Sequence, residues 1–566
     1  EHTFKHAVLR DVAYQSVLRK LRKKYHVRAA EWLRSVVEAN GRADEFAAAI
    51  AEHYDTADEA NDASIWYLRA GEAAAARYAN AEAMSLLDRA LNLIPSHAPE
   101  IRYRVIAARQ AIHNTTGDRQ AEAQDLEELT ALADVLTDDG KRADIELMRA
   151  ALASDVGRLG DAEEHARIAA DLARSVRDTS REARALLAIG AAEWKRGNPA
   201  AAIPVLTDAL EIATTAHHDL VAAGSLHSRG VAYHNMGAYD LAEADYRAAY
   251  QIWHDRNDRE GTSRVLNSLG ILAYDREDFD VARSYLDRAL QTKRALGERL
   301  GENRVLNNLA LVATAQHDYE TVIASFNRTL ALAIEIDDLE GEAASHQGLG
   351  YAALRLGQFD QAQHHLDISR RLFSEEGDQQ GKAQVIELLA QLARSRGNPV
   401  LAEALAQEAA DTASKVGLAI ELAASLVLRA RLQLDRGGFD AAAQTFQKVL
   451  DLHPDLGSPA RLVQVRAGLA EALQAVDRPQ EARRLVEEAV EHFRTRGSAG
   501  VNEPIEALLA CNRVLKAQND AAAHEPIEMA HRHLAESARR ISDPELRRSY
   551  LENVAAHRIL GQIGKS

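Results

Sequence analysis

The sequence predicts an all-α protein in which pairs of helices repeat along the chain and stack into a right-handed superhelical solenoid. Two observations predict this fold class. Segments that begin at Gly237, Glu277, His317 and Gly357 resemble one another and start at equal intervals, and a fixed period of this kind is typical of repeat proteins. Proline (11 of 566 residues) and aromatic residues (5%) are scarce, which favours helices over a β-sandwich or a barrel.

Each period is expected to contain two helices, because small residues recur at two sites that a turn separates. The first site holds Gly230, Gly270, Ala310, Gly350 and Ala390, and the second holds Ala242, Ala282, Ala362, Ala402 and Ala442. Residues 275–280, between the two sites, are rich in helix breakers. Leu286 and Ala289 follow Ala282 at helical spacing, so small and large residues share one face. We expect the two helices to pack closely at the small sites.

Aspartate recurs where the second helix of each pair is expected to begin, at Asp240, Asp280 and Asp360. Aspartate is a preferred helix N-cap, because its carboxylate accepts hydrogen bonds from the free N–H groups of the first turn. We therefore expect these three residues to cap the second helices.

The repeats divide the chain into three predicted parts. Weaker copies occur at residues 78–91, 117–131 and 160–173, so we expect about eleven helix pairs over residues 63–495. Residues 1–62 are expected to form a helical junction, and residues 496–566 are expected to form C-terminal capping helices.

The repeats resemble tetratricopeptide repeats in a 40-residue form. Leu269, the small residue at 270 and its partners at 282 and 289 carry this resemblance. It implies a tetratricopeptide-like solenoid of helical hairpins, an architecture that binds other chains and performs no catalysis of its own.

The two ends resemble parts of large bacterial signalling ATPases of the STAND type, many of which carry a class III nucleotide cyclase. Residues 4–33 resemble the junction through which an ATPase and winged-helix region enters a tetratricopeptide arm, and residues 543–560 resemble the closing helix of such an arm. The chain also starts at Glu1 without a methionine. The resemblance implies that this chain is the C-terminal arm of a multidomain protein, with upstream ATPase or cyclase domains as its partners.

Charge and cysteine content exclude several classes of protein. The net charge of −17 argues against binding to nucleic acid, and we interpret the basic run Arg19–Lys24 as a solvated helix face. No apolar stretch is long enough to span a membrane, so no membrane partner is expected. Cys511 is the one cysteine, which excludes a disulfide framework and favours a reducing compartment. We expect a cytoplasmic protein in which Cys511 is buried.

No residue pattern predicts catalysis, a cofactor or a metal site. The histidine pairs His217-His218 and His364-His365 lack the spacing, joined to nearby acids, that a helical metal site needs. No catalytic acid–base pair, nucleophile or phosphate-binding loop is found. The sequence therefore predicts that this chain is not an enzyme.

The inner, concave side of the solenoid is the candidate binding site, because the first helix of each pair lines it. At one position of the repeat register the sequence places Arg264 with Asn267, and then Arg304 with Asn307. In tetratricopeptide proteins that bind peptides, asparagine at this position grips the ligand backbone and cations one turn earlier grip carboxylates. The candidate site comprises Arg264, Asn267, Tyr274, Arg304, Asn307, Asn308, Gln347 and Tyr351.

The same residues have a structural alternative. Asn267 and Asn307 can instead tie adjacent repeats together, and the arginines can pair with acids such as Glu302. Two functions therefore stay open. The first is a sensor or interaction arm of a signalling protein, which binds a peptide segment or inducer in the groove and relays its occupancy to the upstream domains. The second is a static scaffold or oligomerisation arm without a regulated ligand.

Overall fold

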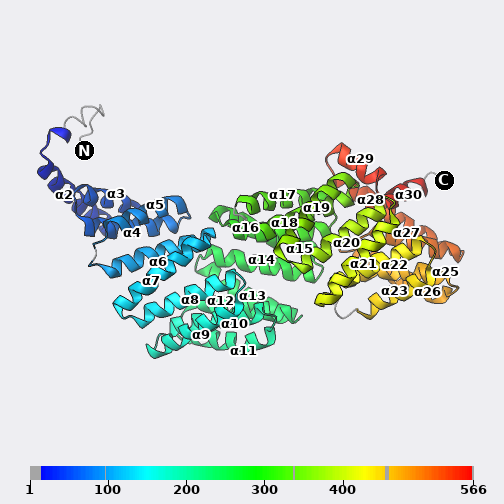
Figure 1. The fold of residues 1–566 in the computed structure, drawn as a ribbon, viewed down its shortest axis with the longest axis horizontal. Helices are drawn as coiled ribbons and strands as arrows, with labels where there is room; N and C mark the ends of the chain where they lie inside the picture. The colour runs from blue at the N-terminus through cyan, green and yellow to red at the C-terminus, as the bar shows by residue number, and fades with distance from the viewer. Residues whose placement is uncertain (1–13, 96, 336–337, 453–457, 564–566) are drawn as a thin grey trace. The chain divides into compact units, whose positions relative to one another are not determined.

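The computed structural model describes residues 14–95, 97–335, 338–452 and 458–563, and these residues contain no β-strand. Helices follow one another as antiparallel hairpins along the chain (Figure 1). Their bounds are α2 (Arg19–Ala39), α3 (Ala43–Thr56), α4 (Ala60–Ala75), α5 (Asn80–Leu93), α6 (Pro99–Thr116), α7 (Arg119–Leu136), α8 (Asp139–Asp155), α9 (Leu159–Ser175), α10 (Thr179–Lys195), α11 (Pro199–Thr215), α12 (Asp219–Asn235), α13 (Tyr239–Asp255), α14 (Arg259–Asp275) and α15 (Phe279–Leu296). They continue with α16 (Arg299–Ala315), α17 (Tyr319–Glu335), α18 (Leu339–Arg355), α19 (Phe359–Glu376), α20 (Gln379–Ser395), α21 (Pro399–Val416), α22 (Ala419–Asp435), α23 (Phe439–Asp451), α25 (Pro459–Ala475), α26 (Pro479–Arg496), α27 (Pro504–Ala517), a short 3₁₀ helix (Ala521–Ala523), α28 (His524–Arg540), α29 (Pro544–Glu552) and α30 (Ala555–Ile563). The prediction of an all-α solenoid of helical hairpins is confirmed.

The chain forms two compact units. The N-terminal unit comprises residues 1–268 and 291–300, and the C-terminal unit comprises residues 269–290 and 301–566. The predicted divisions at residues 62 and 495 stay predictions, and residues 1–13 of the predicted junction lie outside the described part of the chain. In the N-terminal unit, most of the basic run at the start of α2 is exposed to solvent, and Lys23 forms an ion pair with Asp58.

The period is built from two equal halves, each of which holds one helix and one connection. A typical helix has 17 residues, as α14 and α18 do, and three residues connect it to the next helix. One residue of nearly every described connection has a positive φ, and these residues are evenly spaced, as at Gly237, Asn257, Glu277 and Gly297. After α14 the Asp278 N–H donates to Ala273 O (2.8 Å) and the Glu277 N–H donates to Tyr274 O (2.9 Å), the pattern of a left-handed C-terminal cap.

The small sites bring the two helices of a hairpin into close contact, as the sequence predicts. A Cβ atom added to Gly270 would lie 2.6 Å from Cγ of Leu286, and one added to Gly230 would lie 2.8 Å from the ring of Tyr246. Gly350 faces Leu366 in the same way, with the nearest atom 2.7 Å from the added Cβ. A larger residue at any of these positions would push the helices apart.

The predicted helix caps are wrong. Asp240, Asp280 and Asp360 each lie one residue inside a second helix, which begins at Tyr239, Phe279 or Phe359. The caps that form come from the residue directly before a helix, in second helices as well as first ones: Asp318 accepts from the Thr321 N–H (3.2 Å) before α17, and Asn398 accepts from the Leu401 N–H (3.2 Å) before α21. Asp338 accepts a hydrogen bond from the Gly341 N–H (2.9 Å), and Asp178 caps α10 in the same way through the Arg181 N–H (3.0 Å). At the second helices α13 and α19, the residues directly before the helix, Ala238 and Gln358, make no side-chain cap.

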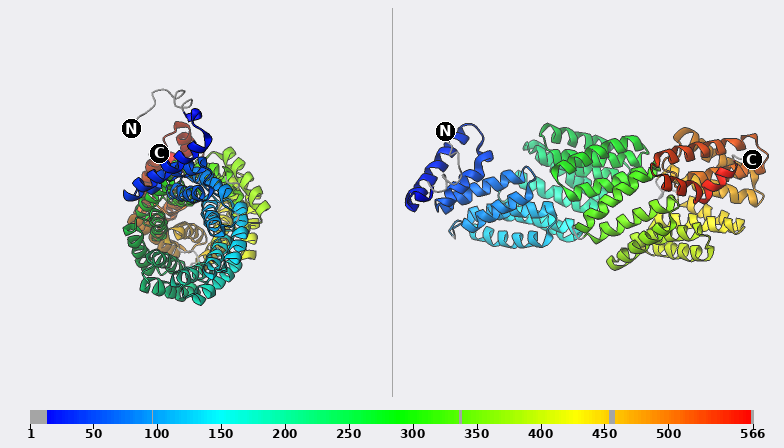
Figure 2. Two further views of the ribbon diagram at one scale, coloured as in Figure 1. Left: turned by 90° about the vertical axis from the view of Figure 1, so that its left-hand side faces the viewer. Right: turned by 90° about the horizontal axis from the view of Figure 1, so that it is seen from above.

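The C-terminal helices fold back onto the hairpins of their own unit. Gly500, between α26 and α27, donates its N–H to Ala315 O (2.9 Å), and Asn553 Nδ2 donates to Gly357 O (3.2 Å). The helices involved are orange to red in Figure 2, and they contact the connections before α17 and α19. Every helix within the described ranges is too short or too polar to span a membrane.

Candidate functional site

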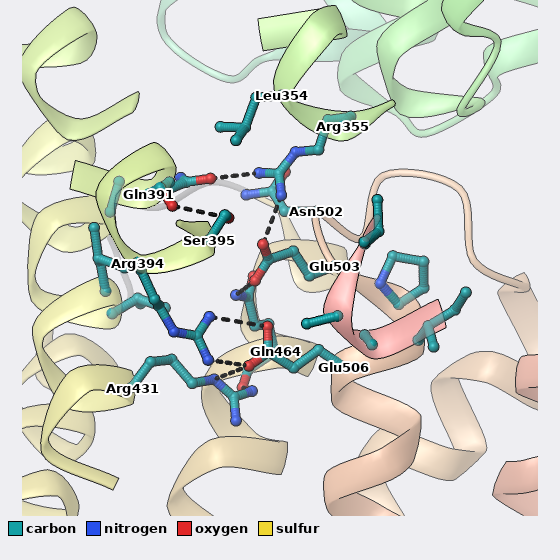
Figure 3. A pocket seen from close by; sticks show the side chains of 18 of the residues that line it. Leu354, Arg355, Gln391, Arg394, Ser395, Arg431, Gln464, Asn502, Glu503 and Glu506 are labelled. Carbon is teal, nitrogen blue, oxygen red and sulfur yellow. Dashed lines mark hydrogen bonds and ion pairs between the residues drawn. The ribbon is translucent and has the colours of Figure 1, made fainter. Parts of the chain in front are cut away.

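The C-terminal unit encloses a cavity of about 760 Å³ (Figure 3). The first helices α18, α20, α22 and α25 line it, and residues of α27 to α30 close it on the opposite side. This position agrees with the expectation that first helices line the inner side of the solenoid.

One position of the repeat register lines the cavity in four successive first helices. Tyr351, Gln391, Arg431 and Glu471 occupy it and all line the cavity. Glu387, at the register position of Asn267 and Asn307, lines the cavity as well. The period therefore preserves the direction of these side chains, while their chemistry changes from one repeat to the next.

Three arginines from α18, α20 and α22 form what we call the arginine cluster: Arg355, Arg394 and Arg431 (Figure 3). Two glutamates at the start of α27, which we call the acidic pair, face them: Glu503 and Glu506. Arg355 Nη1 donates to Glu503 Oε1 (2.5 Å), and Arg394 Nη2 donates to Glu506 Oε1 (2.8 Å). Arg431 Nε lies 3.9 Å from Glu506 Oε1. The inner side thus already binds two carboxylates.

Further polar groups hold these side chains in place. Gln464 Nε2 donates to Glu503 Oε2 (3.0 Å), and Arg355 Nη2 donates to Gln391 Oε1 (2.9 Å). Arg394 also donates from Nε to Asp435 Oδ2 (2.9 Å). The site is therefore a network that spans four first helices and α27.

Burial and charge separate the two glutamates of the acidic pair. Burial raises the pKa of Glu503, and the neighbouring Glu506 raises it further. Burial also acts to raise the pKa of Glu506, but Arg394 and Arg431 outweigh it and hold that pKa well below its usual range. Burial raises the pKa of Glu387 too. Glu506 is thus the firmly ionised acid of the site, while Glu503 and Glu387 ionise less readily than exposed glutamates.

The arginine cluster keeps donor groups that the acidic pair does not use. Among the described residues, the buried Nε–H groups of Arg355 and Arg431 have no hydrogen-bond partner. The side chain of Arg431 is only 3% exposed. A buried donor without an acceptor costs free energy, so an acceptor that reached either of these groups would be stabilised.

Two histidines form the other wall of the cavity. His317 Nε2 donates to the backbone carbonyl of Ser498 (3.1 Å), and Ser498 Oγ lies 2.7 Å from His533 Nδ1. The two rings meet edge to face with centroids 4.8 Å apart. Burial lowers the pKa of His317 to about 4 and that of His533 to about 3, so both rings are neutral near pH 7.

The structure places the predicted site residues at several different locations. Tyr351 lines the cavity, and the guanidinium of Arg355 lies 5.0 Å from its ring centre. Gln347 Nε2 donates to Gln384 Oε1 on the neighbouring first helix (2.9 Å). Tyr274 is half-buried; this burial raises its pKa, and the charge of the cavity-lining Arg461 opposes that rise.

The predicted Arg–Asn clamp spans both units. Arg264 and Asn267 belong to the N-terminal unit, whereas Arg304, Asn307 and Asn308 belong to the C-terminal unit, so the clamp stays a prediction. Arg264 donates to Glu260 one turn earlier (2.5 Å).

Arg304 is exposed, and Asn307 and Asn308 are half-buried. Glu302, the suggested partner of the arginines, accepts a hydrogen bond from Arg328 (3.1 Å).

The arginine cluster and the acidic pair were not found from the sequence. Arg355 and Arg394 lie near the C-terminal ends of their helices, away from the register position that the peptide-binding pattern uses. Glu503 and Glu506 follow the last regular repeat. The recurrence of Tyr351, Gln391 and Arg431 at one register position is the sequence signal that points to this cavity.

No group of three or more histidine, cysteine, aspartate or glutamate side chains that could hold a metal ion occurs within the described ranges. Cys511 is buried in α27, as expected, and burial raises the pKa of its thiol to about 12.

Comparison with known families identifies the repeats. One family model, described as tetratricopeptide repeat, matches residues 221–295 and 301–375, and a second with the same description matches residues 147–217 and 348–416. These segments carry tetratricopeptide repeats, and the fold is a tetratricopeptide-like solenoid. A comparison with curated protein sequences finds no significant match.

Solved structures with similar folds are distant in sequence. Aspartyl phosphate phosphatase F from Bacillus subtilis is 16% identical, covers 64% of this chain and 95% of its own, and has a TM-score of 0.44. A Rap protein complexed with competence and sporulation factor is 14% identical, covers 65% of this chain and 99% of its own, and has a TM-score of 0.45. Yeast Tom70 is 16% identical, covers 89% of this chain and 96% of its own, and has a TM-score of 0.34.

Proposed function

We propose that this chain is a non-catalytic interaction arm that binds an acidic peptide segment on the inner side of its C-terminal unit. One observation carries the proposal: the arginine cluster binds the carboxylates of the acidic pair inside a cavity of about 760 Å³. Inner surfaces of helical-hairpin solenoids are extended and suit peptide-sized ligands.

The chemistry of the cavity matches such a ligand. A guanidinium presents a rigid fork of donors that fits a carboxylate, and it stays charged even when buried. Gln391 and Gln464 offer amide groups of the kind that pair with a peptide backbone. Tyr319 and Tyr351 supply apolar walls. A short acidic segment would therefore find both charge-assisted and backbone contacts.

A peptide selection tests this function. The full chain is screened against random twelve-residue peptides, and the selected peptides are expected to be rich in glutamate and aspartate. Replacing Arg394 and Arg431 together by lysine keeps their charges but removes the forks, so it should weaken the selected peptides about tenfold or more. The matched control is R478K/R494K, since Arg478 and Arg494 pair with exposed acids outside the cavity. Selection of peptides without acidic residues, or equal binding by both variants, would contradict the proposal.

We also propose the Arg–Asn clamp of the two central repeats as a second contact for the partner. Replacing Arg264 and Arg304 together by alanine should weaken the selected peptides about tenfold and make the remaining binding less sensitive to salt. The fold should survive, because Arg264 is half exposed and Arg304 is exposed. Unchanged affinity would remove the clamp and leave the arginine cluster as the binding site.

For the intact protein we propose a bacterial, cytoplasmic signalling ATPase of the STAND type, with this chain as its sensor arm. The support is the resemblance of residues 4–33 and 543–560 to the flanks of such arms. The alternative is a static scaffold or an oligomerisation arm. ATP hydrolysis by the intact protein, measured with and without a selected peptide, separates the two, because a scaffold would show no change.

A further inference from the structure

We propose that the acidic pair is a built-in competitor, which an acidic partner segment must displace from the arginine cluster before it can bind. This inference rests on the proposed function, and it defines the partner more closely. The partner segment carries two carboxylates three residues apart, as Glu503 and Glu506 do. The chain therefore holds its own binding site in an occupied state.

The contacts of the acidic pair are those expected of a bound acidic ligand. Its two carboxylates meet arginines of different first helices, Arg355 of α18 and Arg394 of α20. The contacts join positions 148 and 112 residues apart in the sequence, so they do not arise from the packing of neighbouring helices. Residues three apart on a helix lie on one side, so a single helical turn presents both carboxylates to the cluster.

The segment that carries the acidic pair can move without loss of a helix cap. Glu503 is the N-terminal flanking residue of α27, but its side chain makes no capping hydrogen bond. Gly497 (φ 73°) and Gly500 (φ 79°) lie between α26 and α27, and their conformations are readily accessible to glycine. Release of the two carboxylates requires the connection and the first two turns of α27, as far as Cys511, to shift, which breaks the bond from the Gly500 N–H to Ala315 O and exposes Val501 and Ile505.

The acidic pair does not saturate the cluster, which leaves an advantage for a partner. Because the buried Nε–H groups of Arg355 and Arg431 have no hydrogen-bond partner among the described residues, a segment with additional acceptors can make bonds that Glu503 and Glu506 do not make. The tethered pair acts at a high effective concentration, so it excludes weak acidic segments. A partner can bind only those chains in which the acidic pair has left the arginine cluster. Its apparent affinity is therefore its intrinsic affinity multiplied by the fraction of chains in that open state.

Cys511 provides a readout of this opening. It is the one cysteine in the sequence and lies about two turns after Glu503 in α27, where it is fully buried. A thiol reagent reacts with Cys511 only when α27 opens, because a buried thiol is inaccessible and resists ionisation.

The test uses the full chain and a fluorescent peptide that copies residues 500–508. The variant E503Q/E506Q should bind this peptide about tenfold more tightly than the wild-type chain does, because its arginines have lost their internal carboxylates. A peptide with both glutamates replaced by glutamine should bind at least about tenfold more weakly to the variant. The matched control is E491Q/E525Q, which removes two carboxylates that pair with Arg494 outside the cavity and should behave as wild type.

A second measurement covers the case in which E503Q/E506Q does not fold. In the wild-type chain, a saturating amount of the acidic peptide should raise the rate of Cys511 modification several-fold, and the glutamine peptide should leave it unchanged. Equal affinity of wild type and E503Q/E506Q, or an unchanged Cys511 rate with the acidic peptide bound, overturns the internal competitor. If R394K/R431K still weakens selected peptides in that case, the proposed function stands without it. Failure to select any acidic peptide overturns both proposals.

Discussion

Arg394 and Glu506, 112 residues apart in the sequence, form a two-bond ion pair that joins the last turn of α20 to the first turn of α27. In most solenoids a repeat contacts only its neighbours, and its stability is set by that local interface. Here an electrostatic contact spans several hairpins of the C-terminal unit. Helix α27 therefore contributes to the stability of α20, which lies several hairpins earlier in the sequence.

The first prediction concerns this ion pair. Glu506→Gln should lower the free energy of unfolding by about 1 to 3 kcal/mol, because it leaves part of a largely buried guanidinium without its acid. Asp435 continues to bind Arg394, which keeps the loss below that of a fully isolated charge. Urea unfolding followed by circular dichroism measures the change. The control Glu525→Gln breaks a more exposed pair with Arg494 and should cost less than about 1 kcal/mol. Equal losses in the free energy of unfolding would show that the buried ion pair contributes no more to stability than the exposed one.

The second prediction concerns the small site of the helix pair α14–α15. Gly270→Ala places a Cβ 2.6 Å from Cγ of the fully buried Leu286, so it should destabilise the protein by about 1 to 3 kcal/mol. Gly160→Ala is the control. Gly160 lies in α9 with no atom within 4 Å of the added Cβ, so alanine there should be neutral or stabilise the helix by up to about 1 kcal/mol. Thermal melting of both variants is the measurement, and a wild-type melt of Gly270→Ala would contradict the close packing.

The third prediction concerns the connections between helices. Thr137 has a φ of 51°, an unfavourable conformation for a β-branched residue, and it is exposed. Thr137→Gly should therefore stabilise the protein by about 1 kcal/mol. Gly397 (φ 74°) is exposed with no atom within 4 Å of an added Cβ, so Gly397→Ala should destabilise it by a similar amount through backbone strain alone. Changes of the same sign in the two variants would contradict the argument.

The fourth prediction concerns acid sensitivity. Burial lowers the pKa of His317 to about 4 and that of His533 to about 3, whereas the unfolded chain titrates near 6.5. As the pH falls, protons therefore bind to these histidines in the unfolded chain before they bind in the folded one. The free energy of unfolding is not reduced by the histidines above about pH 6.5, and it decreases as the pH drops toward 4. At pH 5 each histidine accounts for a loss of at most about 2 kcal/mol.

Urea unfolding at pH 7 and pH 5 measures this loss. The variant H533Q should lose less stability between the two pH values than the wild-type chain. The nearby His557 and Arg540 face the same ring and remain in the variant, so they do not account for the difference. An unchanged loss in H533Q would contradict the assignment.

The fold could be predicted from the sequence because the period is local. Gly270 and Leu286 lie in one hairpin, so their spacing alone indicates that they meet. The helix caps were predicted at the wrong positions, because Asp280 lies beside the turn in the sequence but one residue inside the helix in the structure. Local patterns identify which helices pair, but helix ends depend on the geometry of the connections.

The candidate site was predicted only in part, and Tyr351 is the predicted residue that lines the cavity. Arg355 and Glu503 meet because the path of several successive hairpins brings α18 and α27 together. That path is the sum of small rotations between repeats, and no short sequence pattern contains it. The acidic pair also lies outside the period, so the register gives no reason to connect it with the arginines.

The even spacing of the connections limits how the chain can gain or lose length. Removal of one complete hairpin between two equivalent connections, such as those at Gly377 and Gly417, rejoins a second helix to a first helix in the original phase. Removal of a single helix with its connection would place a first helix where a second one belongs, and its cavity-lining face would turn toward solvent. Insertions and deletions inside the solenoid are therefore tolerated only as complete hairpins. Each such change shifts the residues that follow it by one complete repeat along the solenoid.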